Sequence, residues 1–459
     1  MDQNIQIYVD NIEGRNSHSG KRDAPVDTAE KAFSLLPPSW TGRAELIFAM
    51  TGRPYEILTD AVCFGTPIGP KASPLVIRGG YEDLLAITAS DSSNGDIVPT
   101  TADQPADALI GAVLTRMSGT GSPVGTAISI RGNTSGPASN ILLQQTIGKI
   151  GAGDRFTVQR PAVTLRPTQT LNLTSHDGRS PNLTLVGIKV APAEGSSLNL
   201  LNVRAQCDTC EFAFERAGAM VHTNARIHGG IEIEALSPGL DPKRAQAGVY
   251  IHSNAATNII AAVRNGIFGG HLTFKDITVR VSQGGVLVPH SLEALRAPIH
   301  ILTGGSALGQ PNLRTGQFGW GTATNKARIR NVAGLTGDGL RIFNGGTLNS
   351  PAGAIHLDIF GCGRDGVRLD MGSTASFGPP DGDAGLVTSG PPNAQFGMNV
   401  RNASRALIGK DAADAKLKGG DRDGYGDVTV DDKRPARQWS EVTLTPLSNP
   451  GMSLVRVNT

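Results

Sequence analysis

The spacing most specific for chemistry lies near the C-terminus, where carboxylates alternate with glycines. Residues 421–427 read DRDGYGD, and the chain continues as VTVDD to Asp432. A loop of this kind can wrap several oxygen atoms around a hard cation. In a twelve-residue calcium loop, Asp421 and Asp423 would fill positions 1 and 3. Asp427 would offer its carbonyl at position 7, and Asp432 would take position 12. The spacing therefore predicts a Ca²⁺ site.

Two departures leave a second interpretation of this stretch open. Tyr425 stands where a ligand oxygen is expected, and Asp432 is shorter than the usual bidentate glutamate. The stretch resembles the Asp-Gly-x-Gly-Asp core of thrombospondin type 3 repeats, and this resemblance implies Ca²⁺ binding. The alternative is a solvated acidic loop whose glycines provide flexibility.

Two pairs of carboxylates have a spacing that would suit glycoside hydrolysis, which uses one acid and one base or nucleophile. Glu232 and Glu234 share one face of a predicted strand, and Asp358 and Asp370 occupy polar positions of neighbouring strands. Polar positions that alternate with core positions face outward by default. We therefore expect both pairs to lie on a solvated outer face, and no catalytic residue is assigned.

Lyase chemistry would need a lysine or arginine base. Four candidates lie on predicted strands, and none is distinguished by its neighbours: Lys189, Arg280, Arg330 and Arg368.

Cys207 and Cys210 have the spacing of a metal or redox pair, and His222 and His228 would complete a zinc site. There is no second CxxC pair and no thioredoxin-like βαβ context. Two ordinary turn or core residues are the more usual explanation for a lone pair.

A repeat of short strands must position all these residues. NLTLVGIKV (182–190) and HLTFKDITV (271–279) match in polar character at each position, and KARIRNVAG (326–334) repeats the theme. Gly366-Val367 follows Gly339-Leu340 by 27 residues. A repeat of this length is too short for a βαβ unit. The sequence therefore predicts an all-β, right-handed, three-sided parallel β-helix over 44–408.

Other segments depart from this repeat. Residues 1–43 predict a strand at 5–9 and a capping helix at 27–36, with Asp27 as its N-cap. Residues 91–126 have little periodicity and predict an insertion, and 409–459 predict a polar Asp/Gly-rich loop with a C-terminal strand.

The segment AELIFAMTGRPYEILTDAV…SPLVIRGG (44–80) resembles the first coils of pectate-lyase-like right-handed β-helix proteins. That superfamily includes polysaccharide lyases, glycosidases and phage tailspikes. The resemblance implies the fold and leaves the activity open.

Composition excludes some classes of partner. The 42 basic and 40 acidic residues form no basic block, so nucleic acid is not implied. No apolar run is long enough to insert in a membrane, and no Sec signal is visible. We expect synthesis in the cytoplasm, then a place in a virion or related particle. A cytoplasmic or non-classically exported protein would look the same.

Two functional classes remain. In the first, the chain is a receptor-binding spike of a phage tail or related injection particle, and its expected partners are a cell-surface glycan, two further copies of the chain and other particle proteins. In the second, it is a polysaccharide lyase or glycoside hydrolase that acts in a groove on the β-helix face.

Overall fold

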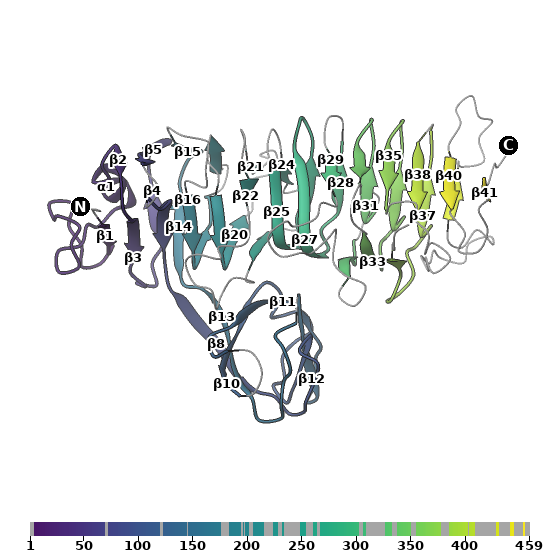
Figure 1. Ribbon diagram of the computed structural model, residues 1–459, viewed down its shortest axis with the longest axis horizontal. Helices are drawn as coiled ribbons and strands as arrows, with labels where there is room; N and C mark the ends of the chain where they lie inside the picture. The colour runs from purple at the N-terminus through teal and green to yellow at the C-terminus, as the bar shows by residue number, and fades with distance from the viewer. Residues whose placement is uncertain are drawn as a thin grey trace. The chain divides into compact units, whose positions relative to one another are not determined.

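The computed structural model is built almost entirely of β-strands, most of them in parallel sheets (Figure 1). It describes residues 4–68, 72–119, 123–144, 146–175, 183–193, 196, 198–201, 205–214, 224–227, 232–233, 248–253, 260–263, 267–302, 306–308, 326–332, 337–349, 355–377, 385–402, 404–408, 428–430, 441–444 and 453–454. The chain divides into two compact units. The first comprises residues 1–259 and 270–273, and the second 260–269 and 274–459.

The first unit contains three parallel ladders, which the chain visits in the same order in each coil. The first ladder comprises β1 (Ile5–Val9), β3 (Ala44–Phe48), β7 (Leu75–Arg78), β16 (Leu183–Val186) and β19 (Ala205–Asp208). The second comprises β4 (Tyr55–Ile57), β14 (Val163–Pro167), β17 (Ile188–Val190), β20 (Cys210–Phe214) and β23 (Val249–Ser253). The third comprises β5 (Ala61–Phe64), β15 (Leu171–Ser175), β18 (Leu198–Leu201) and β21 (Asn224–Ile227).

The second unit repeats this arrangement. One ladder, here called the arginine ladder, comprises β24 (Ile260–Val263), β26 (Thr278–Val281), β28 (Ile299–Ile301), β31 (Leu340–Ile342), β34 (Val367–Leu369), β37 (Met398–Val400) and β39 (Val428–Val430). The next comprises β29 (Ser306–Leu308), β32 (Thr347–Asn349), β35 (Thr374–Ser376), β38 (Arg405–Ile408) and β40 (Glu441–Leu444). The last comprises β30 (Ala327–Arg330), β33 (His356–Phe360) and β36 (Gly385–Val387), and the long strand β27 (Val286–Leu295) pairs with both of these ladders.

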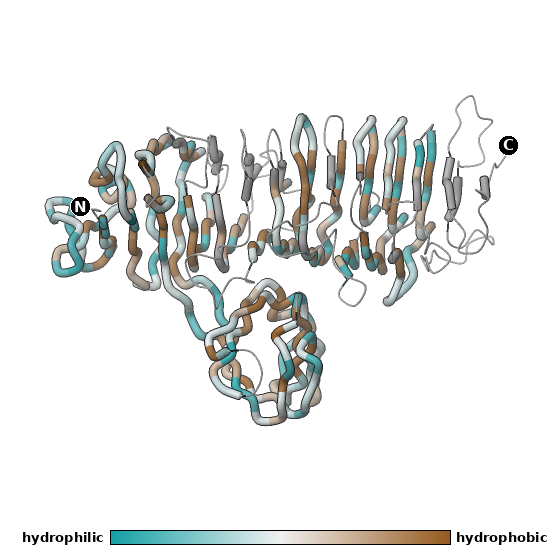
Figure 2. The backbone as a smooth tube through the Cα atoms, in the orientation of Figure 1, coloured by the Kyte–Doolittle hydropathy of each residue, from teal (hydrophilic) through white to brown (hydrophobic). Residues whose placement is uncertain are grey.

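Columns of apolar residues form the core between the ladders. Leu340, Val367 and Met398 are register partners and are fully buried. Each coil adds one residue to such a column because parallel strands pair in register. Figure 2 shows hydrophobic segments recurring along successive strands.

Left-handed residues form the corners at which the chain turns between ladders. Asp276, Arg296, Asn331 and Gly361 have φ between 51° and 65°. The backbone N–H of Arg296 donates to Arg330, and that of Asn331 donates to Phe360, so each corner is hydrogen-bonded to the next coil. The Asp-Gly pairs at 338–339 and 365–366, whose glycines the sequence would suggest for such corners, differ: Gly339 is not left-handed, but a Cβ there would lie 2.9 Å from the Gly366 carbonyl oxygen. Close packing of the coils requires this glycine.

The predicted insertion lies within a larger module, an antiparallel barrel. Its strands are β8 (Tyr81–Thr88), β9 (Ile97–Thr100), β10 (Val113–Ser118), β11 (Ala127–Asn133), β12 (Ser139–Leu143) and β13 (Arg155–Pro161). They form a six-stranded sheet whose outer strands are joined by the bridge between Ala89 and Thr100. The barrel encloses its own apolar core, which includes Leu114 and Phe156. Residues 91–126 therefore include strands of a folded module (Figure 1).

The single helix of the described residues is α1 (Ala29–Ser34). Its N-cap is Thr28, whose hydroxyl accepts a hydrogen bond from the Lys31 amide; the prediction of Asp27 as the cap is wrong. Glu30, in the first turn of the helix, accepts a hydrogen bond from the Leu58 amide. No helix in the described ranges is long and apolar enough to span a membrane.

The remaining strands are the nine-residue β25 (Ile267–Lys275) and the two-residue strands β2 (Ser39–Trp40), β6 (Thr66–Pro67), β22 (Glu232–Ile233) and β41 (Ser453–Leu454). β2 pairs in parallel with β6, and β41 pairs antiparallel to β40.

Candidate functional site

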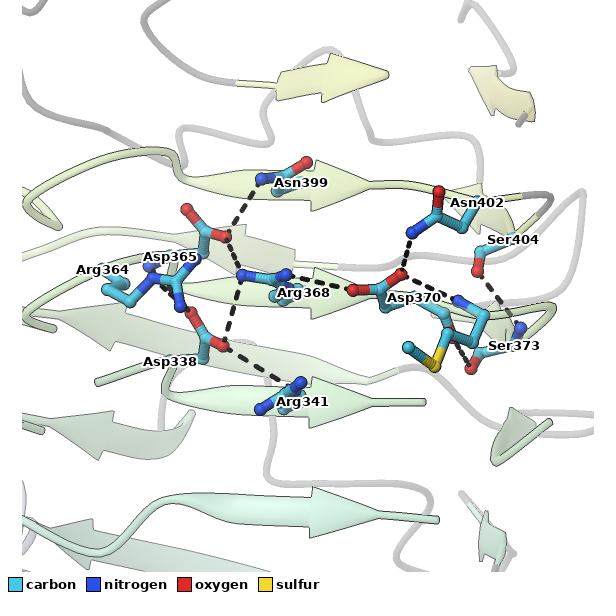
Figure 3. Close-up of polar contacts among 11 residues, drawn as sticks. Asp338, Arg341, Arg364, Asp365, Arg368, Asp370, Ser373, Asn399, Asn402 and Ser404 are labelled. Atoms are coloured by element: carbon cyan, nitrogen blue, oxygen red, sulfur yellow. Dashed lines mark hydrogen bonds and ion pairs between the residues drawn. The ribbon is translucent and has the colours of Figure 1, made fainter. Parts of the chain in front are cut away.

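Polar side chains lie in line across the arginine ladder. Arg341 on β31, Arg368 on β34 and Asn399 on β37 are register partners on adjacent strands. Each lies between two buried apolar residues of its own strand, so its side chain leaves the opposite face of the sheet. Figure 3 shows the three side chains one above another.

Carboxylates surround the middle arginine of this line. Arg368 Nη2 donates to Asp370 Oδ2 at 3.0 Å. Its Nη1 lies 3.9 Å from carboxylate oxygens of both Asp338 and Asp365. Arg341 and Arg364 approach Asp338 at 4.0 and 3.9 Å. We call these six residues the Asp–Arg cluster: Asp338, Arg341, Arg364, Asp365, Arg368 and Asp370.

The cluster is built from the corners of consecutive coils. The Asp338 carboxylate accepts a hydrogen bond from the Asp365 amide at 3.3 Å, and the Asp365 carboxylate accepts one from the Phe396 amide at 3.3 Å. Asn399 Nδ2 donates to the other oxygen of Asp365 at 3.1 Å. Both aspartates are fully buried, so their positions are fixed by backbone as well as by charge.

The carboxyl groups beside the two ends of the Arg368 guanidinium, those of Asp365 and Asp370, differ in acidity. Burial and the neighbouring Asp338 charge raise the pKa of Asp365 to about 6. Burial also acts to raise the pKa of Asp370, but the hydrogen bonds from Asn402 and Arg368 outweigh it and hold that pKa below its usual range. Two carboxyl groups on one scaffold whose pKa values are shifted in opposite directions are an arrangement that acid–base catalysis uses.

Two predicted residues belong to this cluster, and a third lies elsewhere. Arg368 and Asp370 are in contact, whereas Asp358 on β33 accepts hydrogen bonds from the amide and hydroxyl of Ser389 at 2.9 and 2.5 Å. Asp358 and Asp370 therefore lie on different ladders with different partners. The expectation that both face solvent is wrong: Asp358 is 6% and Asp370 4% exposed.

A second charged column crosses the ladder of β27, β30 and β33. Glu293, Arg328 and Asp358 are register partners of alternating charge. Arg330, a predicted lyase base, instead donates to the fully buried Glu293 at 2.6 Å. An arginine so paired is held as a cation and cannot accept a proton.

A third charged group lies in the first unit, on β17, β20 and β23. Glu211 Oε1 lies 2.9 Å from Lys189 Nζ and 2.8 Å from His252 Nε2. Burial acts to raise the pKa of Glu211, but His252 and Lys189 outweigh it and lower the pKa to about 2. Lys189, another predicted base, is therefore the partner of a carboxylate that is ionised at neutral pH.

The barrel module packs beside this group. The His252 ring stacks on Tyr250 at 4.5 Å, and Arg160 of β13 lies over Tyr250 at 5.7 Å. A Cβ at Gly111 would lie 2.3 Å from the Tyr250 ring, so only glycine allows this approach.

Several predicted residues are not placed with these groups. Glu232 lies on β22, but its side chain and Glu234 are outside the described residues, as are His222 and His228. The side chains of the predicted calcium ligands are also outside them: Asp421, Asp423, Asp427 and Asp432. Within the described residues, no three His, Cys, Asp or Glu residues gather as a metal site. Cys207 and Cys210 are buried and are not joined by a disulfide, and Cys210 Sγ donates to the Leu185 carbonyl at 3.3 Å.

Known proteins resemble this chain only distantly. No protein-family model and no curated protein matches the sequence. Among solved structures, the lacto-N-biosidase of family GH136 from Eubacterium ramulus shares 9% identity at a TM-score of 0.25, over 95% of this chain and 67% of its own. The tailspike gp61 of Pseudomonas phage phi297 shares 12% identity at a TM-score of 0.27, and the match covers 83% of this chain and 72% of the tailspike chain. The tailspike Gp54 of Acinetobacter baumannii bacteriophage AP22, solved with capsular saccharide, shares 12% identity at a TM-score of 0.22. That match covers 82% of this chain and 74% of the tailspike chain. At TM-scores this low we base no conclusion on the likenesses.

Proposed function

We propose that this chain is a glycan-directed, right-handed β-helix whose ladders close into a solenoid and whose first coil is covered by α1. Its role is that of a receptor-binding spike of a phage tail or related injection particle. The observation that carries the glycan-directed part is the row of in-register polar side chains on the arginine ladder. Fixed planar donors and acceptors on a rigid sheet are suited to the hydroxyls of an extended polymer, because little side-chain freedom is lost on binding.

The spike role is supported by the ladders themselves. Within the described ladders, strand interiors pair from coil to coil, which favours a stiff, protease-resistant element. Light scattering tests this role: we expect a mass of three chains and resistance to SDS and protease. A monomer would contradict the trimeric spike and favour a free-standing enzyme.

The glycan itself is tested with a panel of capsular and cell-surface polysaccharides by titration calorimetry. We expect binding to at least one polymer, weakened by Arg368→Gln and unchanged by Arg155→Gln on the exposed surface of the barrel. Binding equally affected by both variants, or none at all, would contradict a site on the arginine ladder.

A second candidate function, glycan cleavage, is favoured by the unequal acidity of Asp365 and Asp370. Asp365 would act as the proton donor and Asp370 as the ionised partner. Reducing-end release from a bound polymer, abolished by Asp365→Asn while binding persists, would support it. Cleavage unchanged in that variant would remove Asp365 from the mechanism.

We further propose that the C-terminal loop binds Ca²⁺ through Asp421, Asp423, Asp427 and Asp432, whose spacing alone supports the site. Calorimetry with CaCl₂ should give a binding heat that Asp421→Ala removes and that Asp91→Ala, at an exposed barrel position, leaves intact. If the wild-type chain gives no binding heat with CaCl₂, the proposed Ca²⁺ site is wrong.

A further inference from the structure

The polar row of the arginine ladder extends beyond the Asp–Arg cluster. Arg341 on β31 pairs with His300 on β28, and His300 pairs with Arg280 on β26. A second row lies two residues further along these strands and leaves the same face, because side chains alternate along a strand. Backbone hydrogen bonds join each coil to the coil before it along this second row. We call it the end row, and its members are Leu302, Phe343, Asp370 and Arg401.

The end row changes in character along its length. Asp370 and Arg401 are charged, whereas Leu302 and Phe343 are apolar and partly exposed. Most aromatic side chains that the structure describes in the second unit are buried instead, among them Phe268, Phe274, Phe360 and Phe377. Because polar residues are usual on an outward face, a partly exposed aromatic ring at such a position indicates a contact surface.

The Phe343 ring is held by its neighbours on the same face. The guanidinium carbon of Arg341 lies 4.4 Å from the ring centroid. The His300 ring meets the Phe343 ring edge-on, with centroids 6.2 Å apart and an interplanar angle of 82°. Arg341 is in turn ion-paired with Asp338 at 4.0 Å, so its charge is compensated and its planar group supports the ring. A ring that is already ordered loses little conformational freedom when a ligand binds.

We infer that Phe343 is a stacking platform for a neutral pyranose ring of the glycan. The sugar packs its C–H face on the exposed part of the ring, and Leu302 on the preceding coil extends the apolar surface. Removal of both surfaces from water drives this contact, which needs no charge on the sugar. Arg341 and Arg368 are themselves paired with carboxylates, so we expect no acidic sugar to be required. The inference rests on the proposed glycan-directed function and adds the class of sugar and the residue that selects it.

The test titrates the full-length chain with two neutral polysaccharides, dextran and a galactan, and with polygalacturonate, alongside the capsular and cell-surface panel. We expect a neutral polymer to bind with a negative heat-capacity change, which is the sign of apolar burial. Its affinity should change by less than about twofold between about 0.05 and 0.5 M NaCl, because salt does not screen stacking. Binding confined to acidic polymers, or an affinity that falls steeply with salt, would overturn the stacking platform.

Phe343→Ala should weaken binding of the neutral polymer about tenfold or more, and Phe343→Tyr should retain it. Phe343→Leu keeps an apolar side chain without the ring; it should also weaken binding, and it decides the question if the alanine variant fails to fold. Tyr8→Ala, which removes a partly exposed aromatic side chain of the first unit, is the matched control and should bind as wild type. Wild-type affinity in Phe343→Ala or Phe343→Leu overturns this inference and leaves the glycan-directed function standing. Binding to no polymer overturns both.

Discussion

The Asp338 carboxylate accepts a hydrogen bond from the backbone N–H of Asp365, 27 residues later at the same corner of the next coil. The Asp365 carboxylate then does the same for Phe396. Two acidic side chains are thus stacked by the backbone at a separation that like charges disfavour. This arrangement explains the raised pKa of Asp365, for which burial is the larger cause and the Asp338 charge the next.

Asp365→Asn should stabilise the protein at alkaline pH. A carboxyl whose folded pKa is raised contributes stability below its unfolded pKa, and that stability is lost as pH rises through the folded value, here about 6. The amide removes the charge, so we expect a gain of about 2 kcal/mol at pH 8 and none near pH 3.5. Melting temperatures at both pH values, with Asp276→Asn as a control in a partly exposed ion pair, measure it. Destabilisation at pH 8 would show that the Asp365 charge is needed by Arg368.

Glu211→Gln should destabilise the first unit near neutral pH. The pKa of Glu211 is lowered to about 2, so its contribution is present above about 4.5 and is lost as pH falls toward 2. Removing one member of a buried charge group costs about 3 kcal/mol. Thermal unfolding at pH 7 should show this loss, and the gap between variant and wild type should narrow at pH 3. A constant gap at both pH values would point to lost packing instead.

Arg116→Leu should unfold the barrel module selectively. Arg116 is fully buried on β10, and its Nη2 donates to Asp154 at 2.5 Å and to the Lys149 carbonyl at 2.9 Å. The variant leaves Asp154 buried without its cation, at a cost of about 3–5 kcal/mol. Hydrogen exchange should then increase within 81–161 and remain slow in β14 and β17. Arg155→Leu, at an exposed neighbouring position, should leave exchange unchanged.

Removal of the barrel should leave the coils folded. The Ala162 amide donates to the Gly80 carbonyl at 2.9 Å, so the chain leaves and rejoins the coil at adjacent points. Replacing 81–161 by two glycines should retain the β-sheet circular dichroism of the remaining chain. The excised module, which encloses its own core, should fold alone with dispersed NMR signals. A collapsed deletion variant would show that the coils depend on the barrel for stability.

Local periodicity was sufficient to predict the ladders. The 27-residue offset between the Asp338 and Asp365 corners, together with the apolar residues after them, places Leu340 opposite Val367 as the structure has them. The same offset relates Arg341 to Arg368, so the polar row could have been found by extending the register to polar positions. Arg368 is distinguished from the other arginines of the row by three carboxylates that converge on it, Asp338, Asp365 and Asp370. This convergence depends on how the buried corners of successive coils stack.

Non-local packing explains the features that the sequence did not reveal. The barrel strands β10 and β13 pair across an intervening 36 residues, with Gly and Pro between the strands, so local periodicity is interrupted. His252 and Glu211 are hydrogen-bonded although they lie 41 residues apart in the sequence. This separation differs from the 27-residue offset of the repeat. The left-handed corners at Arg296 and Asn331 carry no glycine, because the hydrogen bond to the next coil offsets the cost of their backbone conformation.

The uniform register of the ladders also bears on how the chain is made. Most strands pair with the strand one coil earlier, so a nascent coil finds its template already folded beside it. Folding can then advance from the N-terminus at the pace of translation, without a search through distant segments. In such a process the barrel would complete itself as a side branch before β14 rejoins the first coils, and a stalled coil would arrest only the coils that are synthesised after it.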